Sequence, residues 1–171
     1  MHRAFAATLA ALACTAAVAT LGTAQPASAS GVSYMLKNVA TGKCMKGNSS
    51  RAAYPDDNRA YDVTMVTCNR NDVNQWWGYI SGGTIVMTAS THDTGICLSV
   101  QKTPSGDFAR GVYTARCANK PYGQKFNTGV TSNYPIGSAS PACYVGHYAG
   151  GDSWPACYGN HGSNTRWNWV S

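Results

Sequence analysis

The sequence predicts a single all-β domain built from three similar units. Only 12% of its 171 residues are charged, whereas soluble domains usually have about 25%. Glu is absent and Leu and Lys are scarce, while Gly, Ser, Thr, Asn and Tyr are abundant. Because the scarce residues are strong helix formers, this composition favours strands and turns. A chain of this length normally forms one domain.

The first 29 residues have the pattern of a secretory signal peptide. A positive start, Met1–Arg3, precedes an Ala-rich apolar run over residues 4–21, and Ala27–Ala29 supplies the small residues of a cleavage site. The alternative is a retained membrane anchor, but Ala is only weakly apolar and helix-breaking residues follow the run. We therefore expect residues 30–171 to be secreted, extracellular and without a membrane span.

A repeated pattern covers the rest of the chain. Each unit has two cysteines and a closing triplet, which is Gln-x-aromatic in the first two units and Thr-x-aromatic in the third. The triplet begins seven residues after the second cysteine in the first two units, and eight residues after it in the third. In chain order the sets are Cys44, Cys68 and Gln75-Trp76-Trp77; Cys97, Cys117 and Gln124-Lys125-Phe126; and Cys143, Cys157 and Thr165-Arg166-Trp167.

The repeats, at about residues 31–82, 83–130 and 131–171, favour a local disulfide framework. An even number of cysteines in an exported chain implies disulfides, and six cysteines allow 15 pairings. Because each unit has its own pair, we expect each pair to close within its unit. Metal ligation is disfavoured, since the spacing of a zinc site is missing. Short apolar runs between turn residues predict about four strands per unit, or about twelve in all.

These features together resemble the ricin B-type lectin domain, and the resemblance covers residues 33–170. It implies a β-trefoil, an all-β fold with pseudo-threefold symmetry. In that fold six strands form a short barrel and six more form hairpins that cap one end. The resemblance also implies that Trp77, Phe126 and Trp167 pack into the shared core.

The resemblance further implies one shallow sugar pocket per unit. In the usual pocket an Asp, two residues after the first cysteine, accepts hydrogen bonds from two sugar hydroxyls, and an aromatic ring stacks on the sugar. This sequence has Lys46, Ser99 and Val145 at those positions, and none of them can replace the carboxylate. The amide partner of the pocket is kept in the first unit as Asn74 and Gln75, which are candidate ligand-binding residues.

The third unit offers a different candidate site. Residues 131–171 contain one basic and one acidic residue and seven aromatic residues, a combination that suits stacking on a neutral ligand. A carboxylate and several rings lie within eleven residues, so they could form a pocket; the alternative is that the rings pack under a loop. The candidate residues are Tyr144, His147, Tyr148, Asp152 and Trp154.

We therefore expect a secreted, non-catalytic binding module, with a carbohydrate-binding lectin as the first hypothesis. Its partner would be a glycan or a cell-surface polysaccharide. The alternative hypothesis is a trefoil with degenerate sugar sites that binds a protein partner, such as a toxin subunit, an enzyme or a host protein. The sequence lacks the paired carboxylates of a glycosidase, and it indicates no cofactor, no metal and no specific nucleic acid.

Overall fold

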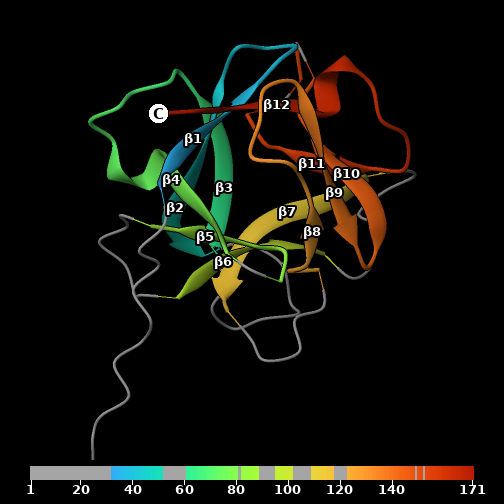
Figure 1. The fold of residues 1–171 in the computed structure, drawn as a ribbon, viewed down its shortest axis with the longest axis horizontal. Coiled ribbons are helices and arrows are strands. Elements are labelled where there is room, and N and C mark those ends of the chain that lie inside the picture. Colours follow the sequence, from blue (N-terminus) through green and yellow to red (C-terminus); the bar gives the residue numbers. More distant parts are fainter. Residues whose placement is uncertain are drawn as a thin grey trace, which may run out of the picture.

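The chain forms twelve strands and two 3-10 turns in the computed structural model, which describes residues 32–51, 61–80, 82–88, 95–101, 109–117, 123–148, 150–151 and 153–171 (Figure 1). The strands follow the three sequence units, so the expected four strands per unit are confirmed. The first unit contains β1 (Tyr34–Asn38), β2 (Cys44–Arg51), β3 (Tyr61–Val66), η1 (Val73–Gln75) and β4 (Trp76–Ile80). The second contains β5 (Thr84–Met87), β6 (Ile96–Val100), β7 (Ala109–Arg116) and β8 (Phe126–Asn127). The third contains β9 (Tyr134–Ala139), β10 (Ala142–Gly146), β11 (Ala156–Tyr158), η2 (Ser163–Thr165) and β12 (Arg166–Val170).

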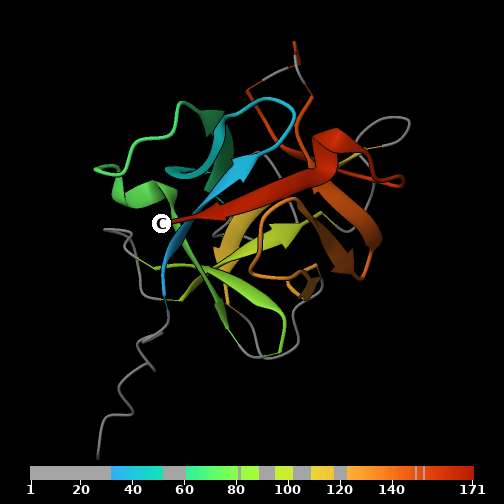
Figure 2. The ribbon, with the colours of Figure 1, turned by 45° about the horizontal axis from the view of Figure 1, so that its top comes forward.

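The first and last strands of the units form a barrel. β1 pairs with β4 and β12, β4 pairs with β5, and β9 pairs with β8 and β12. The ring closes between the second unit's own ends, where the Phe126 N–H donates to the Gly83 carbonyl at 2.6 Å. Figure 2 shows the last strand, β12, lying alongside β1. The two ends of the folded chain are therefore held together.

Three hairpins cover one end of this barrel. They are β2–β3, β6–β7 and β10–β11. β7 pairs with both β3 and β11, and a backbone hydrogen bond of 2.6 Å from Met65 to Ser153 joins the third hairpin to the first. Six barrel strands capped by three mutually bonded hairpins define a β-trefoil, so the predicted fold class is confirmed.

The closing aromatic residue of each unit lies in the core, as predicted. Trp77 and Trp167 are fully buried and Phe126 is 3% exposed. The indole N–H of Trp77 donates to the Met45 carbonyl at 3.0 Å, and that of Trp167 donates to the Val145 carbonyl at 2.8 Å. A buried donor needs such a partner. The two tryptophans therefore link the last strand of their unit to its second strand.

The three predicted cystines are present, and each lies within one unit. Cys44 pairs with Cys68, Cys97 with Cys117 and Cys143 with Cys157, with Cα–Cα distances of 4.9, 5.0 and 5.5 Å. In the chain-entropy description, closing loops of this length stabilises the fold by about 3 kcal/mol each. This contribution matters in a small domain whose described residues are mostly strands and turns.

Strand register shows which residues of the first and third units are equivalent. On the barrel, Tyr34 of β1 lies opposite Trp77, and Tyr134 of β9 lies opposite Trp167. Because the two tryptophans have the same place in the core, Tyr134 corresponds to Tyr34. The rest of β9 therefore corresponds to β1 residue by residue.

This equivalence corrects the sequence alignment of the third unit by one residue. Three residues further along the two strands, Lys37 lies opposite Cys44, whereas Gly137 lies opposite Tyr144. Tyr144 thus takes the place of the first cysteine, and Cys143 lies one residue before it. The cysteine spacing alone had suggested that Cys143 and Cys44 were equivalent.

The shift also moves the third cystine within its hairpin. Tyr144 lies opposite Tyr158, whereas Cys44 lies opposite Val66. In the first unit the second cysteine comes two residues after Val66, beyond the paired strands. In the third unit Cys157 comes one residue before Tyr158, inside the hairpin. The third cystine therefore connects paired strands, and the open end of that hairpin carries two tyrosines.

The predicted signal peptide, residues 1–29, lies outside the described residues. Within the described ranges, no helix has the length and apolar character needed to cross a membrane.

Gly123 provides a test of the contact between the second and third units. Its N–H donates to Ser140 at 2.7 Å and its carbonyl accepts from Val100 at 2.9 Å, its φ is +69°, and a Cβ there would collide with the Val100 carbonyl oxygen. We expect Gly123→Ala to destabilise the fold by about 3 kcal/mol, measured by urea unfolding. The strain of a left-handed backbone at a non-glycine residue and the steric overlap of the new Cβ with Val100 both contribute.

Gly42→Ala is the matched control. Gly42 has nearly the same φ, +66°, but a Cβ there would meet only Lys37 Cε at 3.9 Å. Its cost should be about 1 kcal/mol, from the backbone conformation alone. Equal costs for the two variants would contradict the close approach at Gly123.

Candidate functional site

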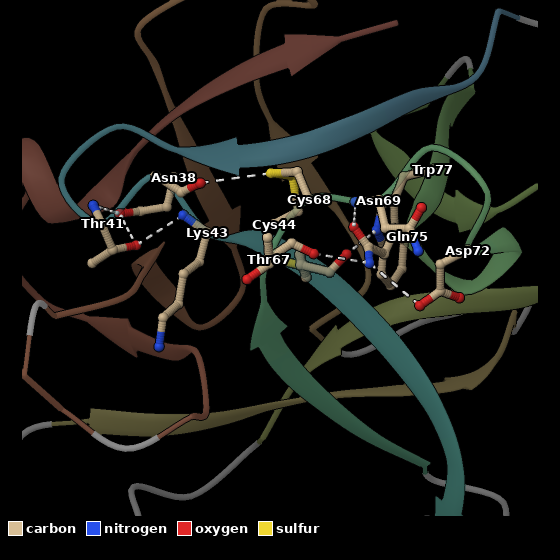
Figure 3. Close-up of a disulfide and its surroundings, with 12 residues drawn as sticks. Asn38, Thr41, Lys43, Cys44, Thr67, Cys68, Asn69, Asp72, Gln75 and Trp77 are labelled. Atoms are coloured by element: carbon tan, nitrogen blue, oxygen red, sulfur yellow. Dashed lines mark hydrogen bonds between the residues drawn. A yellow bond between two sulfur atoms is a disulfide. The ribbon is translucent and has the colours of Figure 1, made fainter.

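Gln75, a predicted ligand-binding residue, is buried and makes hydrogen bonds within the protein. It is 1% exposed and lies next to the Cys44–Cys68 cystine (Figure 3). Its side-chain oxygen accepts from the Asn69 N–H at 3.0 Å, and its side-chain nitrogen donates to the Thr67 carbonyl and to Asp72 Oδ2, both at 3.3 Å. These bonds hold the segment between β3 and β4 in place.

Gln124 makes the equivalent bond in the second unit. Its side-chain nitrogen donates to the Arg116 carbonyl at 3.0 Å, and Arg116, like Thr67, directly precedes the second cysteine of its unit. In the third unit Thr165 bonds instead within its own turn, to Gly162. The glutamine of the closing triplet therefore has a structural role, which accounts for its repetition.

Lys46, in the position where the family has a carboxylate, is paired with one. Lys46 Nζ lies 2.9 Å from Asp72 Oδ2, and the two side chains are 29% and 19% exposed. Asp72 also accepts from the Asn74 N–H at 3.1 Å and so caps η1. The first unit thus has a carboxylate near the family position, but the protein's own groups occupy it.

The pKa of the Asp72 carboxyl is lowered from its ordinary value. Burial raises the pKa, but the hydrogen bonds from Lys46, from the Asn74 backbone and from Gln75, together with the charge of Lys46, outweigh burial. Asp72 is therefore ionised near neutral pH, and its negative charge is balanced by Lys46.

The equivalent positions in the other two units are closed. Ser99 is 1% exposed, and its hydroxyl accepts from Gln124 at 2.9 Å. In the third unit the register places Gly146 at this position, and Val145, which the sequence comparison placed there, is a fully buried core residue. A Cβ at Gly146 would lie 2.9 Å from the Asn164 carbonyl oxygen, so the position has no room for a side chain.

His147 and Asn74, two of the predicted ligand-binding residues, are both withdrawn from the surface to some degree. His147 is 2% exposed, and its Nδ1 lies 3.0 Å from the Thr41 hydroxyl, so it links the third unit to the first. Asn74 is partly buried, and its side-chain oxygen is buried without a hydrogen-bond partner. The structure thus places His147 in the interior.

Three other residues predicted in the third unit, Tyr144, Tyr148 and Trp154, are at least partly exposed. Tyr148 is 50% exposed and Trp154 is 47% exposed, and Tyr144 is partly exposed. Asp152 lies outside the described residues. Tyr148 and Trp154 both lie on the segment that connects β10 to β11.

Two ring pairs of the third unit lie on or next to the β10–β11 hairpin, and we call their four residues the aromatic row: His161, Tyr144, Tyr158 and Tyr148. The His161 and Tyr144 rings are 5.1 Å apart, and the Tyr158 and Tyr148 rings are 4.7 Å apart, both edge to face. Tyr144 and Tyr158 lie opposite each other on β10 and β11. Tyr148 and His161 are exposed, and the two central tyrosines are partly exposed.

Sequence reasoning found two members of this row and missed Tyr158 and His161. Strand alternation could have found Tyr158, because it follows the buried Cys157 and must point to the opposite face. Burial raises the pKa of the Tyr158 phenol, and the nearby Tyr148 adds to this effect. Tyr158 therefore keeps its proton near neutral pH and can donate a hydrogen bond at the edge of the row.

Metal chemistry has no support in the described part of the chain, where no group of three or more His, Cys or acidic residues could hold an ion.

Comparisons with known proteins agree on the fold. No family model matches the chain, and no curated protein matches it in sequence. The designed threefold symmetric protein ThreeFoil is similar in structure, with a TM-score of 0.63 and 18% identity over 81% of this chain and 98% of that one. A Culex salivary protein of the Cysteine and Tryptophan-Rich family has a TM-score of 0.61 and 16% identity, over 81% and 92% of the two chains.

An exo-β-1,3-galactanase from Clostridium thermocellum is also similar. The TM-score is 0.57 with 19% identity, and the match covers 81% of this chain but 30% of the galactanase. At such low identities the likeness shows a shared fold with threefold symmetry.

The Lys46–Asp72 pair predicts a pH dependence of stability. The lowered pKa means that the unfolded chain binds the Asp72 proton more tightly than the folded protein does. The stabilisation is therefore present above the ordinary value of 3.8 and is lost as the pH falls through the lowered value. We expect Asp72→Asn to cost about 1 kcal/mol at pH 6 and less at pH 3, measured by urea unfolding.

Lys46→Gln tests the other partner of the pair. This variant removes the ammonium that lowers the pKa of Asp72, so it should also reduce the difference in stability between pH 6 and pH 3. An unchanged difference in both variants would show that the pair contributes nothing.

Proposed function

We propose that the chain is a secreted, non-catalytic carbohydrate-binding module, a lectin similar to the ricin B-type domains. The observation that carries this proposal is the exposed aromatic surface of the third unit, formed by the aromatic row. This surface belongs to a β-trefoil, which is also the fold of that lectin family. Within this proposal the third unit is the ligand-binding part of the molecule, and Asp152 and Trp154 stay candidate residues from the sequence.

The chemistry of the surface suits a neutral glycan. Residues 131–171 contain one basic and one acidic residue, so the unit attracts neither anions nor cations strongly. Sugar rings have apolar C–H faces that stack on aromatic rings and hydroxyls that bond to polar edges. Tyr144, Tyr148 and Tyr158 supply both kinds of contact, and His161 adds a polar edge.

The similarity to the galactanase supports a role beside polysaccharides. That enzyme is named for action on a β-1,3-galactan, and the match spans 30% of it. A module of this fold is therefore found in a protein that acts on a polysaccharide. For this chain, carbohydrate binding is a proposal drawn from that association and from the surface chemistry.

An extracellular location is part of the proposal. Three cystines in one small domain are typical of exported proteins. The signal-peptide pattern of residues 1–29 supports the same location.

A protein-binding role is the second candidate. The observation that favours it is the state of the three family positions: Lys46 is paired with Asp72, Ser99 is buried, and Gly146 has no side chain. A trefoil without free carboxylates at these positions has lost the usual means of holding a sugar. Its exposed rings would then serve as an anchor for a toxin subunit, an enzyme or a host protein.

A glycan array of the secreted protein distinguishes the two candidates. We expect binding to neutral glycans that falls at least about tenfold in Trp154→Ala and in Asp152→Asn, because stacking and a charge-assisted hydrogen bond are lost. Lys46→Gln is the control, since the first-unit position lies outside the proposed site. Binding to no glycan at all would favour the protein partner, and loss of binding only in the control would move the site to the first unit.

A further inference from the structure

The end of the barrel that the hairpins leave uncovered collects exposed apolar side chains. Each unit's first strand starts at this end and its fourth strand finishes there, because the hairpin between them covers the other end. Val32 precedes β1, Ile80 ends β4, Val130 lies between β8 and β9, and Tyr134 begins β9. They are 66%, 36%, 38% and 47% exposed, and they are four of the eight exposed large hydrophobic residues in the described part of the chain.

An aromatic cluster fills the space between the first and last strands at this end. Trp169 is buried, and the rings of Tyr34 and Tyr79 contact it edge to face, with ring centres 5.8 and 6.2 Å from that of Trp169. Tyr34 and Tyr79 are partly exposed. We call the six residues of this end that are at least partly exposed the barrel face: Val32, Tyr34, Tyr79, Ile80, Val130 and Tyr134.

The segment that leads into β9 is fixed to the barrel. Asn133 has a positive φ of 57°, which is uncommon for a residue other than glycine. Its N–H donates to Asn168 Oδ1 at 2.7 Å, and its carbonyl accepts from Arg166 at 3.0 Å. Both partners belong to β12. The chain beside Tyr134 is therefore held in place by the protein itself, so little of its freedom is lost when a partner binds.

The barrel face is uncharged, and cationic side chains lie beside it. Arg166 donates to the carbonyl of Asn133, the residue before Tyr134, and Lys37 is exposed on β1, three residues after Tyr34. No Asp, Lys, Arg or His occurs in the segments that form the face, which are residues 32–36, 79–84, 127–134 and 167–171. An apolar centre therefore has a positively charged margin.

The acidic residues of the described part do not cancel this charge. Asp62 belongs to β3, a strand of the hairpin cap, and the charge of Asp72 is balanced by Lys46. The whole chain has a formal net charge of +6. The molecule as a whole is therefore attracted to anionic surfaces.

This combination of apolar centre and positive margin favours one kind of partner. Exposed apolar residues that gather on one face mark an interaction site. A second copy of the chain would bring the same cationic side chains to the contact, and these would repel one another. An anionic membrane is complementary instead. Tyrosine suits the boundary between acyl chains and headgroups, and Lys and Arg side chains reach anionic headgroups beside it.

We propose that the barrel face docks the protein on the surface of anionic lipid membranes. The exposed apolar residues lie at the boundary of the acyl chains, and Arg166 and Lys37 contact the headgroups. This surface is separate from the hairpins, which carry the family positions and the central tyrosines of the aromatic row. A molecule docked in this way directs its hairpins away from the membrane, so the inference goes beyond the proposed carbohydrate binding.

Cosedimentation of the exported protein with lipid vesicles tests the proposal. We expect binding to vesicles of equal parts phosphatidylcholine and phosphatidylglycerol, and weaker binding to phosphatidylcholine alone. Val130→Asp should weaken the binding to the anionic vesicles at least about tenfold, because an apolar contact is lost and a charge enters the centre of the face. Lys37→Gln should weaken it about fivefold, because one cation beside the headgroups is removed.

Val39→Asp is the matched control. Val39 is 38% exposed, the same fraction as Val130, but it follows β1 at the end of the strand that leads to the hairpin cap. The two variants change the net charge equally, so the difference between them measures the place of the substitution. Val39→Asp should bind nearly as the original protein does. Circular dichroism of all variants checks that the fold is kept.

The remaining outcomes decide against the proposal. Equal weakening by Val130→Asp and Val39→Asp would show attraction by net charge alone and overturn it, as would absence of binding to the anionic vesicles. A dimer in sedimentation velocity that Val130→Asp dissociates would assign the face to a second copy. None of these results bears on the glycan array, so the proposed carbohydrate binding stands or falls separately.

Discussion

The antiparallel register of the strands is the constraint on which the structure depends: each unit's first strand pairs with its second, and with its fourth in the first and third units. It places Trp77, Phe126 and Trp167 at equivalent points of one core and decides which residue of each unit faces solvent. Side chains alternate along a strand, so a shift of one residue exchanges the buried and exposed sets. The third unit contains such a shift relative to its cysteines, and Tyr144 points outward because of it.

The three matched positions Lys46, Ser99 and Gly146 are used in three different ways. In the first unit the position carries Lys46, and its charge is neutralised by Asp72, the N-cap residue of η1 on the segment between β3 and β4. In the second unit the side chain turns inward and bonds to Gln124. In the third unit the position is a glycine packed against the Asn164 carbonyl. None of the three positions therefore offers a free carboxylate to a ligand.

Much of the fold could be predicted because its signals are local and repeated. Two cysteines and a closing aromatic, found three times, were enough to give the trefoil, the cystine pairs and the core role of Trp77. The site was less predictable, because the strand register decides which of its residues face solvent. The cysteines of the third unit suggested an alignment that the strand register does not support, and this concealed Tyr158 and Gly146. The burial of His147 depends on Thr41 of another unit, a contact that no local pattern contains.

The register of the third hairpin is the most direct test of this account, and backbone nuclear Overhauser effects in isotope-labelled protein measure it. The account predicts cross-strand effects between Tyr144 and Tyr158 and between Gly146 and Ala156, with Tyr144 also opposite Gly137. If the cysteines of the three units were equivalent, Cys143 would instead lie opposite Pro155. Effects between Cys143 and Pro155, without those between Tyr144 and Tyr158, would contradict the account.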